Sequence, residues 1–150
     1  MNELLKNKLL WIPIITWFLV QLFKLIVEIV TNRKEKINFR RIFGAGGMPS
    51  SHTACITSLA TSIGIVEGFG STTFALAAVF SFIVMYDAAG VRRAAGKQAR
   101  VLNKIIESGG KEINVQEKLV EFIGHTPIEV FVGMVVGILI GCLFCNMWDL

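Results

Sequence analysis

The chain has two histidines, and each stands close to a proline where an apolar helix is expected to begin. The first ends the stretch G-M-P-S-S-H at residues 47–52, and the second belongs to G-H-T-P at residues 124–127. The first turn of a helix carries unpaired N–H groups and the positive end of the helix dipole, which together suit an anion such as phosphate. A histidine beside that anion can donate a proton or attack as a nucleophile.

Phosphoryl transfer needs donors for the phosphate oxygens, an in-line nucleophile and an acid for the leaving oxygen. The sequence offers His125 or a water as the nucleophile and His52 as the acid. The predicted phosphate-binding residues come from the loop before His52 and from the basic stretch after residue 90. They are Arg41, Gly47, Ser50, Ser51, Arg92, Arg93 and Lys97.

Two carboxylates each have a structural and a catalytic interpretation. Asp87 ends an apolar segment, where an ionisable residue is a functional candidate by default, but it could instead pair with one of the arginines that follow it. Glu129 lies three residues after Thr126, so the two form a capping box that could serve the backbone alone. The same carboxylate could hold one nitrogen of His125 and leave the other free to attack.

Four apolar segments must position these residues. Hydrophobic residues make up 53% of the 150 residues and are concentrated in blocks. A membrane-spanning helix needs about 20 apolar residues, and closely spaced Gly, Ala and Ser favour packed helices over a barrel. The sequence predicts one all-α domain over residues 1–150, a polytopic membrane protein with about four transmembrane helices plus cytoplasmic amphipathic helices. The expected spans are 9–30, 50–67, 71–89 and 127–148, and the amphipathic segments are 97–106 and 114–123.

Lysines and arginines are concentrated in two loops. Residues 31–48 hold five bases and one acid, and residues 87–127 hold seven bases and five acids. The positive-inside rule places both loops in the cytoplasm and both termini outside, so that His52, Asp87 and His125 share one face of a cell membrane. The net charge of +4 indicates attraction to anionic lipid headgroups. Nucleic acid is not expected as a partner, because aromatic residues do not alternate with the basic ones.

Gly133, Gly137 and Gly141 form a G-x-x-x-G-x-x-x-G face on the last apolar segment. Such a face lets another helix approach closely. The partner helix could belong to the same chain or to a second copy in a homo-oligomer.

A metal site is the weaker interpretation of the same polar residues. Asp87, Glu129 and the two histidines could ligate an ion only if the loops converge, and their spacing is not that of a metal motif. We expect no metal and no cofactor.

Three segments resemble the blocks of the divergent branch of the type-2 phosphatidic acid phosphatase and vanadium haloperoxidase superfamily. They read G-G-M-P-S-S-H-T-A, D-A-A-G-V-R-R-A-A-G-K-Q-A and G-H-T-P-I-E-V, and the resemblance covers about residues 9–148. The signatures of the main superfamily are K-x6-R-P, P-S-G-H and S-R-x5-H-x3-D. P-S-S-H at residues 49–52 is similar to the second, with Ser51 in place of glycine. His125 with Glu129 is similar to H-x3-D, with Glu in place of Asp.

The chain departs from those signatures at two places. Leu119 stands six residues before His125, where the third signature has arginine, so one arginine of D-A-A-G-V-R-R would take over that phosphate contact. Lys34 and Arg41 have the spacing of the first signature, but Ile42 replaces its proline.

The resemblance implies a membrane phosphatase that hydrolyses a lipid phosphate monoester. In that role His125 would become phosphorylated, Glu129 would orient it, and His52 would protonate the leaving group. The alternatives are a non-catalytic binder or transporter of a phosphorylated lipid or anion, and a small membrane scaffold whose histidines only cap helices.

Overall fold

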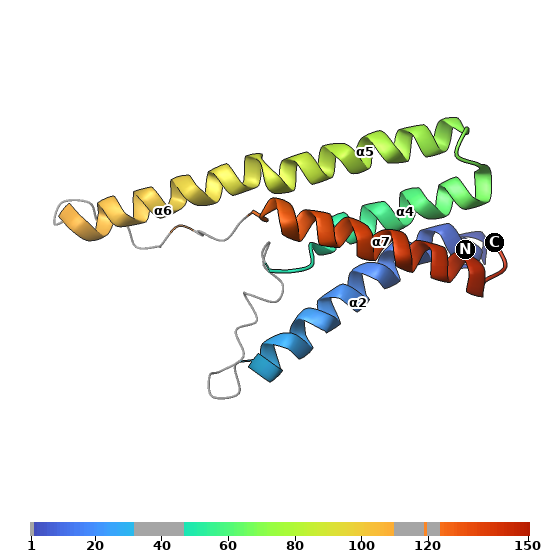
Figure 1. The fold of residues 1–150 in the computed structure, drawn as a ribbon, viewed down its shortest axis with the longest axis horizontal. Coiled ribbons are helices and arrows are strands. Elements are labelled where there is room, and N and C mark those ends of the chain that lie inside the picture. The colour runs from blue at the N-terminus through green and yellow to red at the C-terminus, as the bar shows by residue number, and fades with distance from the viewer. Residues whose placement is uncertain (1, 32–46, 110–118, 120–123) are drawn as a thin grey trace.

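A computed structural model describes residues 2–31, 47–109, 119 and 124–150 of the chain (Figure 1). The helices in these ranges are α1 (Asn2–Lys6), α2 (Lys8–Thr31), α4 (Ser51–Glu67), α5 (Thr72–Ala89), α6 (Val91–Gly109) and α7 (Pro127–Met147). The described ranges contain no strand. The all-α prediction is therefore confirmed for the part of the chain that the structure describes.

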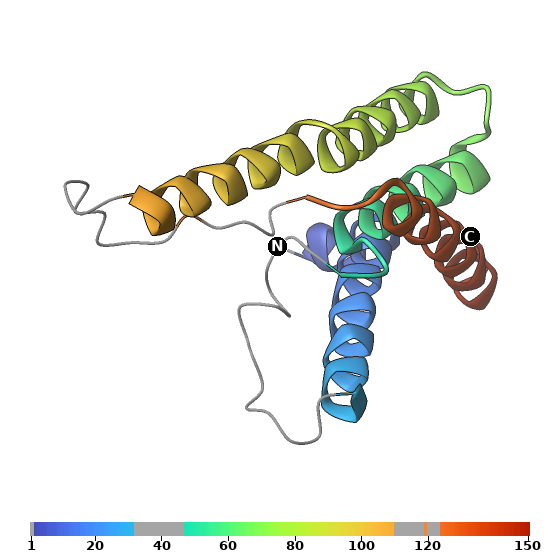
Figure 2. The same cartoon turned by 60° about the vertical axis from the view of Figure 1, so that its left-hand side comes forward.

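The helices run back and forth, so that the two histidine-bearing helix starts lie at the same end of the bundle. Both termini and the turn between α4 and α5 lie at the opposite end (Figure 1). There, Lys8 Nζ donates a hydrogen bond to the Trp148 carbonyl oxygen at 2.6 Å, which joins the start of α2 to the end of α7. Figure 1 shows α2 and α7 diverging away from this junction, and Figure 2 shows α2 running at a steep angle to α5 and α6.

Three helices in the described ranges are long and apolar enough to cross a membrane. They cover Lys8–Val30, Thr72–Ser108 and Pro127–Met147, and the second combines α5 with α6. The helix expected at 97–106 is thus the middle of α6, whereas the segment expected at 114–123 lies outside the described residues except for Leu119. The fourth expected span, 50–67, is the 17-residue helix α4, which is not among the three, so a count of four spans stays a prediction.

α4 is the central helix and packs against α2, α5 and α7. Its buried face carries small hydroxyl residues, which bond to carbonyls and are thereby tolerated away from water. Thr57 Oγ1 donates to the Thr53 carbonyl at 2.8 Å, and Ser62 Oγ donates to the Ser58 carbonyl at 2.8 Å. From α5, Ser81 Oγ reaches the Ile56 carbonyl at 3.2 Å, which ties α5 to α4.

The glycine face of α7 packs on α4 within the same chain. A Cβ atom at Gly133 would lie 2.7 Å from the Ser50 carbonyl oxygen, and one at Gly141 would lie 3.0 Å from the Ser58 carbonyl oxygen. A side chain at Gly137 would collide with Thr57 Oγ1. The structure therefore uses the glycines for packing inside the monomer.

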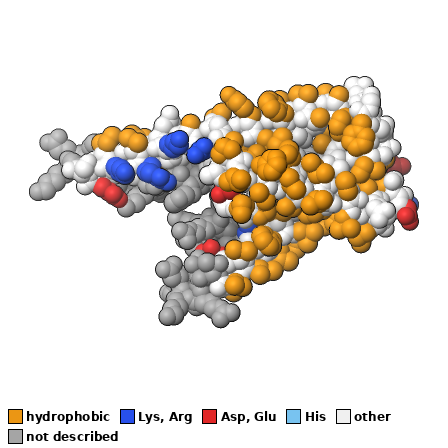
Figure 3. Space-filling view, viewed as in Figure 1, with side chains coloured by type: hydrophobic (Ala, Val, Ile, Leu, Met, Phe, Trp, Pro, Cys, Tyr) orange, Lys and Arg blue, Asp and Glu red, His pale blue; other side chains and the backbone are white. Residues whose placement is uncertain are grey.

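The outer surface of the bundle is apolar. Leu76 and Phe82 of α5 and Leu139 of α7 are each more than 60% exposed. Figure 3 shows hydrophobic side chains over the helices of the bundle, with lysines and arginines over α6. A surface of this kind fits a hydrocarbon environment, in which helices satisfy their own backbone groups.

Candidate functional site

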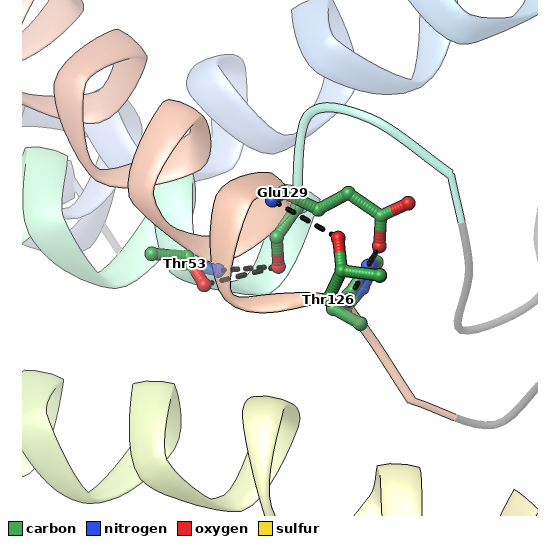
Figure 4. Close-up of polar contacts among 5 residues, drawn as sticks. Thr53, Thr126 and Glu129 are labelled. Carbon is green, nitrogen blue, oxygen red and sulfur yellow. Dashed lines mark hydrogen bonds and ion pairs between the residues drawn. The ribbon is translucent and has the colours of Figure 1, made fainter.

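The start of α4 is fixed by Ser50. Its Oγ accepts hydrogen bonds from Thr53 Oγ1 at 3.0 Å and from the Thr53 N–H at 3.4 Å. Its own N–H donates to the Glu129 carbonyl oxygen at 3.1 Å, so the first turns of α4 and α7 lie side by side (Figure 4). Before it, Gly47 has a φ of +81°, a conformation that glycine adopts without strain.

The start of α7 is a complete capping box. The Thr126 N–H donates to Glu129 Oε2 at 2.9 Å, and the Glu129 N–H donates to Thr126 Oγ1 at 3.4 Å (Figure 4). The same Oε2 atom lies 3.2 Å from His125 Nδ1. The two interpretations of Glu129 are thus both present in the structure, because one oxygen serves the backbone and the imidazole.

This contact sets the hydrogen positions of the His125 ring. A carboxylate oxygen only accepts, so Nδ1 carries the hydrogen and donates it to Glu129. The neutral ring then has its lone pair on Nε2. That atom is buried and has no hydrogen-bond partner among the described residues, and His125 as a whole is 2% exposed.

The backbone around His125 is held by the junction of α5 and α6. The His125 N–H donates to the Ala88 carbonyl oxygen at 3.0 Å. A side chain at Gly124 would collide with the backbone of Arg93. The absence of a side chain at Gly124 therefore allows this close approach, which brings the second and third blocks of the sequence together.

A cavity of about 320 Å³ joins residues from all three blocks. Its polar wall is formed by His52, Asp87, Arg92 and His125. Its apolar wall is a face of α5, formed by Phe80, Ile83, Val84 and Ala88. Asp87 Oδ2 accepts a hydrogen bond from Arg92 Nε within this wall, and both side chains are partly exposed.

The other predicted site residues that the structure describes lie outside the walls of this cavity. Ser50 and Ser51 are buried in the first turn of α4, and Gly47 is exposed before it. Arg93 contributes its backbone to the contact with Gly124. Lys97 lies farther along α6, where it lines a separate surface groove with Gln98, Val101 and Leu102. Arg41 lies outside the described residues.

Burial is the main influence on the protonation of His125, and it favours the neutral form. Burial lowers the pKa of His125 below its usual value, and the positive charge of Lys24 lowers it further. The hydrogen bond and the charge of Glu129 oppose this lowering, and His52 adds a smaller decrease. A neutral imidazole is the form that can act as a nucleophile.

Lys24 influences the site although it belongs to none of the sequence motifs. It lies on α2, is 8% exposed, and interacts electrostatically with His52, His125 and Glu129. The available signal was its charge inside an otherwise apolar block, because an ionisable residue within a membrane segment is costly and usually functional.

The described ranges contain no group of three His, Cys, Asp or Glu residues placed to hold a metal ion. One ring nitrogen of His125 is also occupied by Glu129. In the polar wall of the cavity, Arg92 presents a guanidinium group, which is of the type that binds phosphate and other anions.

Comparison with known proteins shows the family of this chain. The chain is 38% identical over 150 residues to a protein named uncharacterized membrane protein YuiD, from Bacillus subtilis (strain 168), and the match covers 92% of this chain and 94% of that relative. No solved structure matches the chain. The profile of the Divergent PAP2 family matches residues 5–140. Because that match spans most of the chain, the protein belongs to the Divergent PAP2 family of membrane proteins.

Proposed function

We propose that this protein is a membrane phosphatase that hydrolyses a lipid phosphate monoester through a phosphohistidine intermediate. One observation carries the proposal. Nδ1 of His125 is held by Glu129 while Nε2 has no partner in the described chain, and this imidazole shares a cavity with His52 and Arg92. A nucleophile with an orienting carboxylate, a second imidazole and a cation are the parts that phosphoryl transfer requires.

In the first step, His125 Nε2 attacks the phosphorus atom, and the bond from phosphorus to the ester oxygen breaks. His52 donates its proton to that oxygen, which leaves as the alcohol. The phosphorylated imidazole carries positive charge, and the Glu129 carboxylate on Nδ1 stabilises it.

In the second step, the neutral His52 accepts a proton from a water molecule that attacks the phosphorus atom. The bond to His125 Nε2 breaks, and inorganic phosphate is released. One water is consumed for each ester cleaved, and both histidines return to their starting protonation states. No redox or metal step is needed to balance this sequence.

Arg92 is the side chain best placed to hold the phosphate oxygens. It lines the cavity, and its guanidinium is aligned by Asp87. The first turn of α4 contributes His52 to the cavity, and the start of a helix is a favourable place for an anion. Asp87 then acts as the residue that positions Arg92.

We further propose that the cavity lies at the cytoplasmic face, with both termini outside. The support is the concentration of bases in residues 31–48 and 87–127, which precede the two histidine-bearing helix starts in the sequence. The substrate would then be a phosphorylated lipid of the inner leaflet.

The test is phosphate release from lipid phosphates by purified protein in detergent, with trapping of phosphohistidine. We expect turnover by the natural protein and at least a 100-fold loss in both His125→Ala and His52→Ala. Lys104→Ala, on the exposed side of α6, is the control. Turnover that survives both histidine variants would refute the assigned roles.

Binding without turnover would favour the alternative function. If phosphate or vanadate raises the melting temperature of the natural protein but no monoester is hydrolysed, the protein is a binder or transporter of phosphorylated lipid or anion. If neither phosphate nor vanadate changes the melting temperature and no monoester is hydrolysed, the protein is a small membrane scaffold in which the histidines only cap helices.

A further inference from the structure

Asn103 of α6 binds both backbone groups of Leu119. Its Nδ2 donates a hydrogen bond to the Leu119 carbonyl oxygen at 2.9 Å, and its Oδ1 accepts one from the Leu119 N–H at 3.1 Å. Asn103 is only 5% exposed, and a buried amide needs partners for both its donor and its acceptor. This pair of hydrogen bonds, the Asn103 clamp, fixes on α6 a residue that lies six positions before His125.

The chain meets α6 a second time just before His125. A side chain at Gly124 would collide with the backbone of Arg93, so two backbones touch here. Hydrogen bonds hold the chain on either side of this contact. They are the Asn103 clamp on one side and, on the other, the bond of 3.0 Å from the His125 N–H to the Ala88 carbonyl oxygen.

The spacing of the two contacts along α6 matches the reach of the chain between them. Arg93 and Asn103 are ten residues apart in one helix, which is about 15 Å along its axis. Five peptide units join Leu119 to Gly124, and they can reach at most about 18 Å. One more helical turn, about 5 Å, would exceed that reach. Asn103 therefore stands close to the last turn of α6 at which Leu119 can be held while Gly124 keeps its contact.

We infer that Asn103 is a positioning residue for the phosphate site. The clamp holds the chain before His125 on α6, and α6 carries Arg92, so the clamp sets the register between the imidazole and the guanidinium that share the cavity. Asn103 lies outside the cavity wall and acts only through these two residues. The inference rests on the proposed phosphatase function and adds to it the residue that keeps two of its groups in place.

The test replaces Asn103 with alanine, which removes both bonds of the clamp. Gln98→Ala is the matched control, because it removes an exposed amide side chain from the same helix. A second variant inserts two glycines directly after Leu119, which leaves both partners of the clamp in place but lengthens the connection to Gly124. Phosphate release is measured in detergent, and thermal unfolding shows whether each variant is folded at the assay temperature.

We expect kcat/KM to fall at least tenfold in Asn103→Ala and in the insertion variant, because a displacement of about 1 Å in a reacting group can cost about 100-fold in rate. Gln98→Ala should change it by less than threefold. In an Arg92→Ala background, Asn103→Ala should cost less than a further threefold, because the guanidinium that the clamp positions is then absent. An asparagine that only stabilises the fold would lower activity by the same factor in both backgrounds.

The outcomes separate this inference from the proposed function. If the natural protein hydrolyses no monoester, the phosphatase function is wrong, and the clamp is tested by vanadate binding. The Kd for vanadate should then rise at least fivefold in Asn103→Ala and stay within twofold in Gln98→Ala, whereas the absence of both hydrolysis and vanadate binding overturns both proposals.

If monoesters are hydrolysed but Asn103→Ala stays within threefold of the natural protein, the phosphatase function stands and the inference about Asn103 is wrong. Equal losses with and without Arg92 would also overturn it. Should Asn103→Ala fail to fold, the insertion variant decides, since unchanged turnover there would show that the spacing between Leu119 and Gly124 has no role in the site.

Discussion

Replacing Glu129 with glutamine separates the two tasks of this residue. Both hydrogen bonds converge on Oε2, from the Thr126 N–H at 2.9 Å and from His125 Nδ1 at 3.2 Å. A glutamine carbonyl oxygen in that place accepts both bonds, and glutamine is a normal capping-box residue. Glu129→Gln therefore keeps the helix start and the orientation of the imidazole but removes the negative charge.

The expected loss of activity in Glu129→Gln follows from the difference between a hydrogen bond to a charged group and one to a neutral group. A hydrogen bond to a charged group contributes about 1.5–3 kcal/mol and a neutral one about 0.5–1.5 kcal/mol. Losing the charge beside the phosphorylated imidazole thus costs about 1–1.5 kcal/mol in the reaction, which is about a tenfold lower rate. The free energy of unfolding should change by less than about 0.5 kcal/mol, because the cap persists.

Thr126→Ala is the matched variant, since it removes the other half of the box. The hydrogen bond that this variant removes is long, with 3.4 Å between the Glu129 backbone nitrogen and Thr126 Oγ1. We therefore expect the free energy of unfolding to fall by about 0.5–1 kcal/mol, at the low end of the range for the loss of an N-cap. Turnover should stay within about threefold of the natural protein, because Glu129 still holds His125.

The assay is phosphate release in detergent beside thermal unfolding of the same preparations. Full turnover in Glu129→Gln would show that the carboxylate charge has no role in the reaction. Losses of activity that simply follow losses of stability in both variants would show that the capping box is the whole function of Glu129.

Three further outcomes are expected. Gly137→Ala should lower the unfolding free energy by about 1–3 kcal/mol, measured by thermal unfolding, because its Cβ would collide with α4, whereas Leu139→Ala on the exposed face should cost less than about 1 kcal/mol. Because the pKa of His125 is lowered in the folded protein, the contribution of His125 to stability should be constant above about pH 6.5 and fall as the pH decreases below it, and His125 should remain a competent nucleophile to a pH below 6.5; a contribution of His125 to stability, measured against His125→Ala, that falls on raising the pH through this range would contradict the assignment. Lys24→Met removes a charge that lowers this pKa, so the acid limb of the pH–rate profile should move to higher pH, while Lys104→Met should leave it in place.

Much of the fold was predictable because its signals are local. Expected spans at 71–89 and 127–148 correspond to Thr72–Ala89 and Pro127–Met147, and those at 9–30 and 50–67 correspond to Lys8–Thr31 and Ser51–Glu67. Apolar blocks bounded by glycine, proline and capping residues define such helices without reference to the rest of the chain. The sequence of α4 does not show by itself whether this helix crosses the membrane. Its buried serines and threonines lie in a helix that packs against three neighbouring helices, and that packing is not visible in the segment alone.

The candidate site was predictable in composition but not in geometry. The sequence indicates that both histidines stand at helix starts and that Glu129 belongs to a capping box. It does not tell which of two adjacent arginines faces the cavity, because neighbours on a helix point about 100° apart and the direction depends on packing. The structure places Arg92 in the cavity wall, paired with Asp87, and sets the backbone of Arg93 against Gly124.

The sequence by itself determined the residue types, the approximate boundaries of the apolar helices and the family, because these depend on side-chain chemistry and on spacing along the chain. Tertiary structure alone decided which distant groups meet. It placed Lys24 of α2 within electrostatic reach of His125, closed the glycine face of α7 on α4 in the same chain, and gave the cavity an apolar wall on α5. Those features arise from the way in which the helices pack against one another, and no single segment contains them.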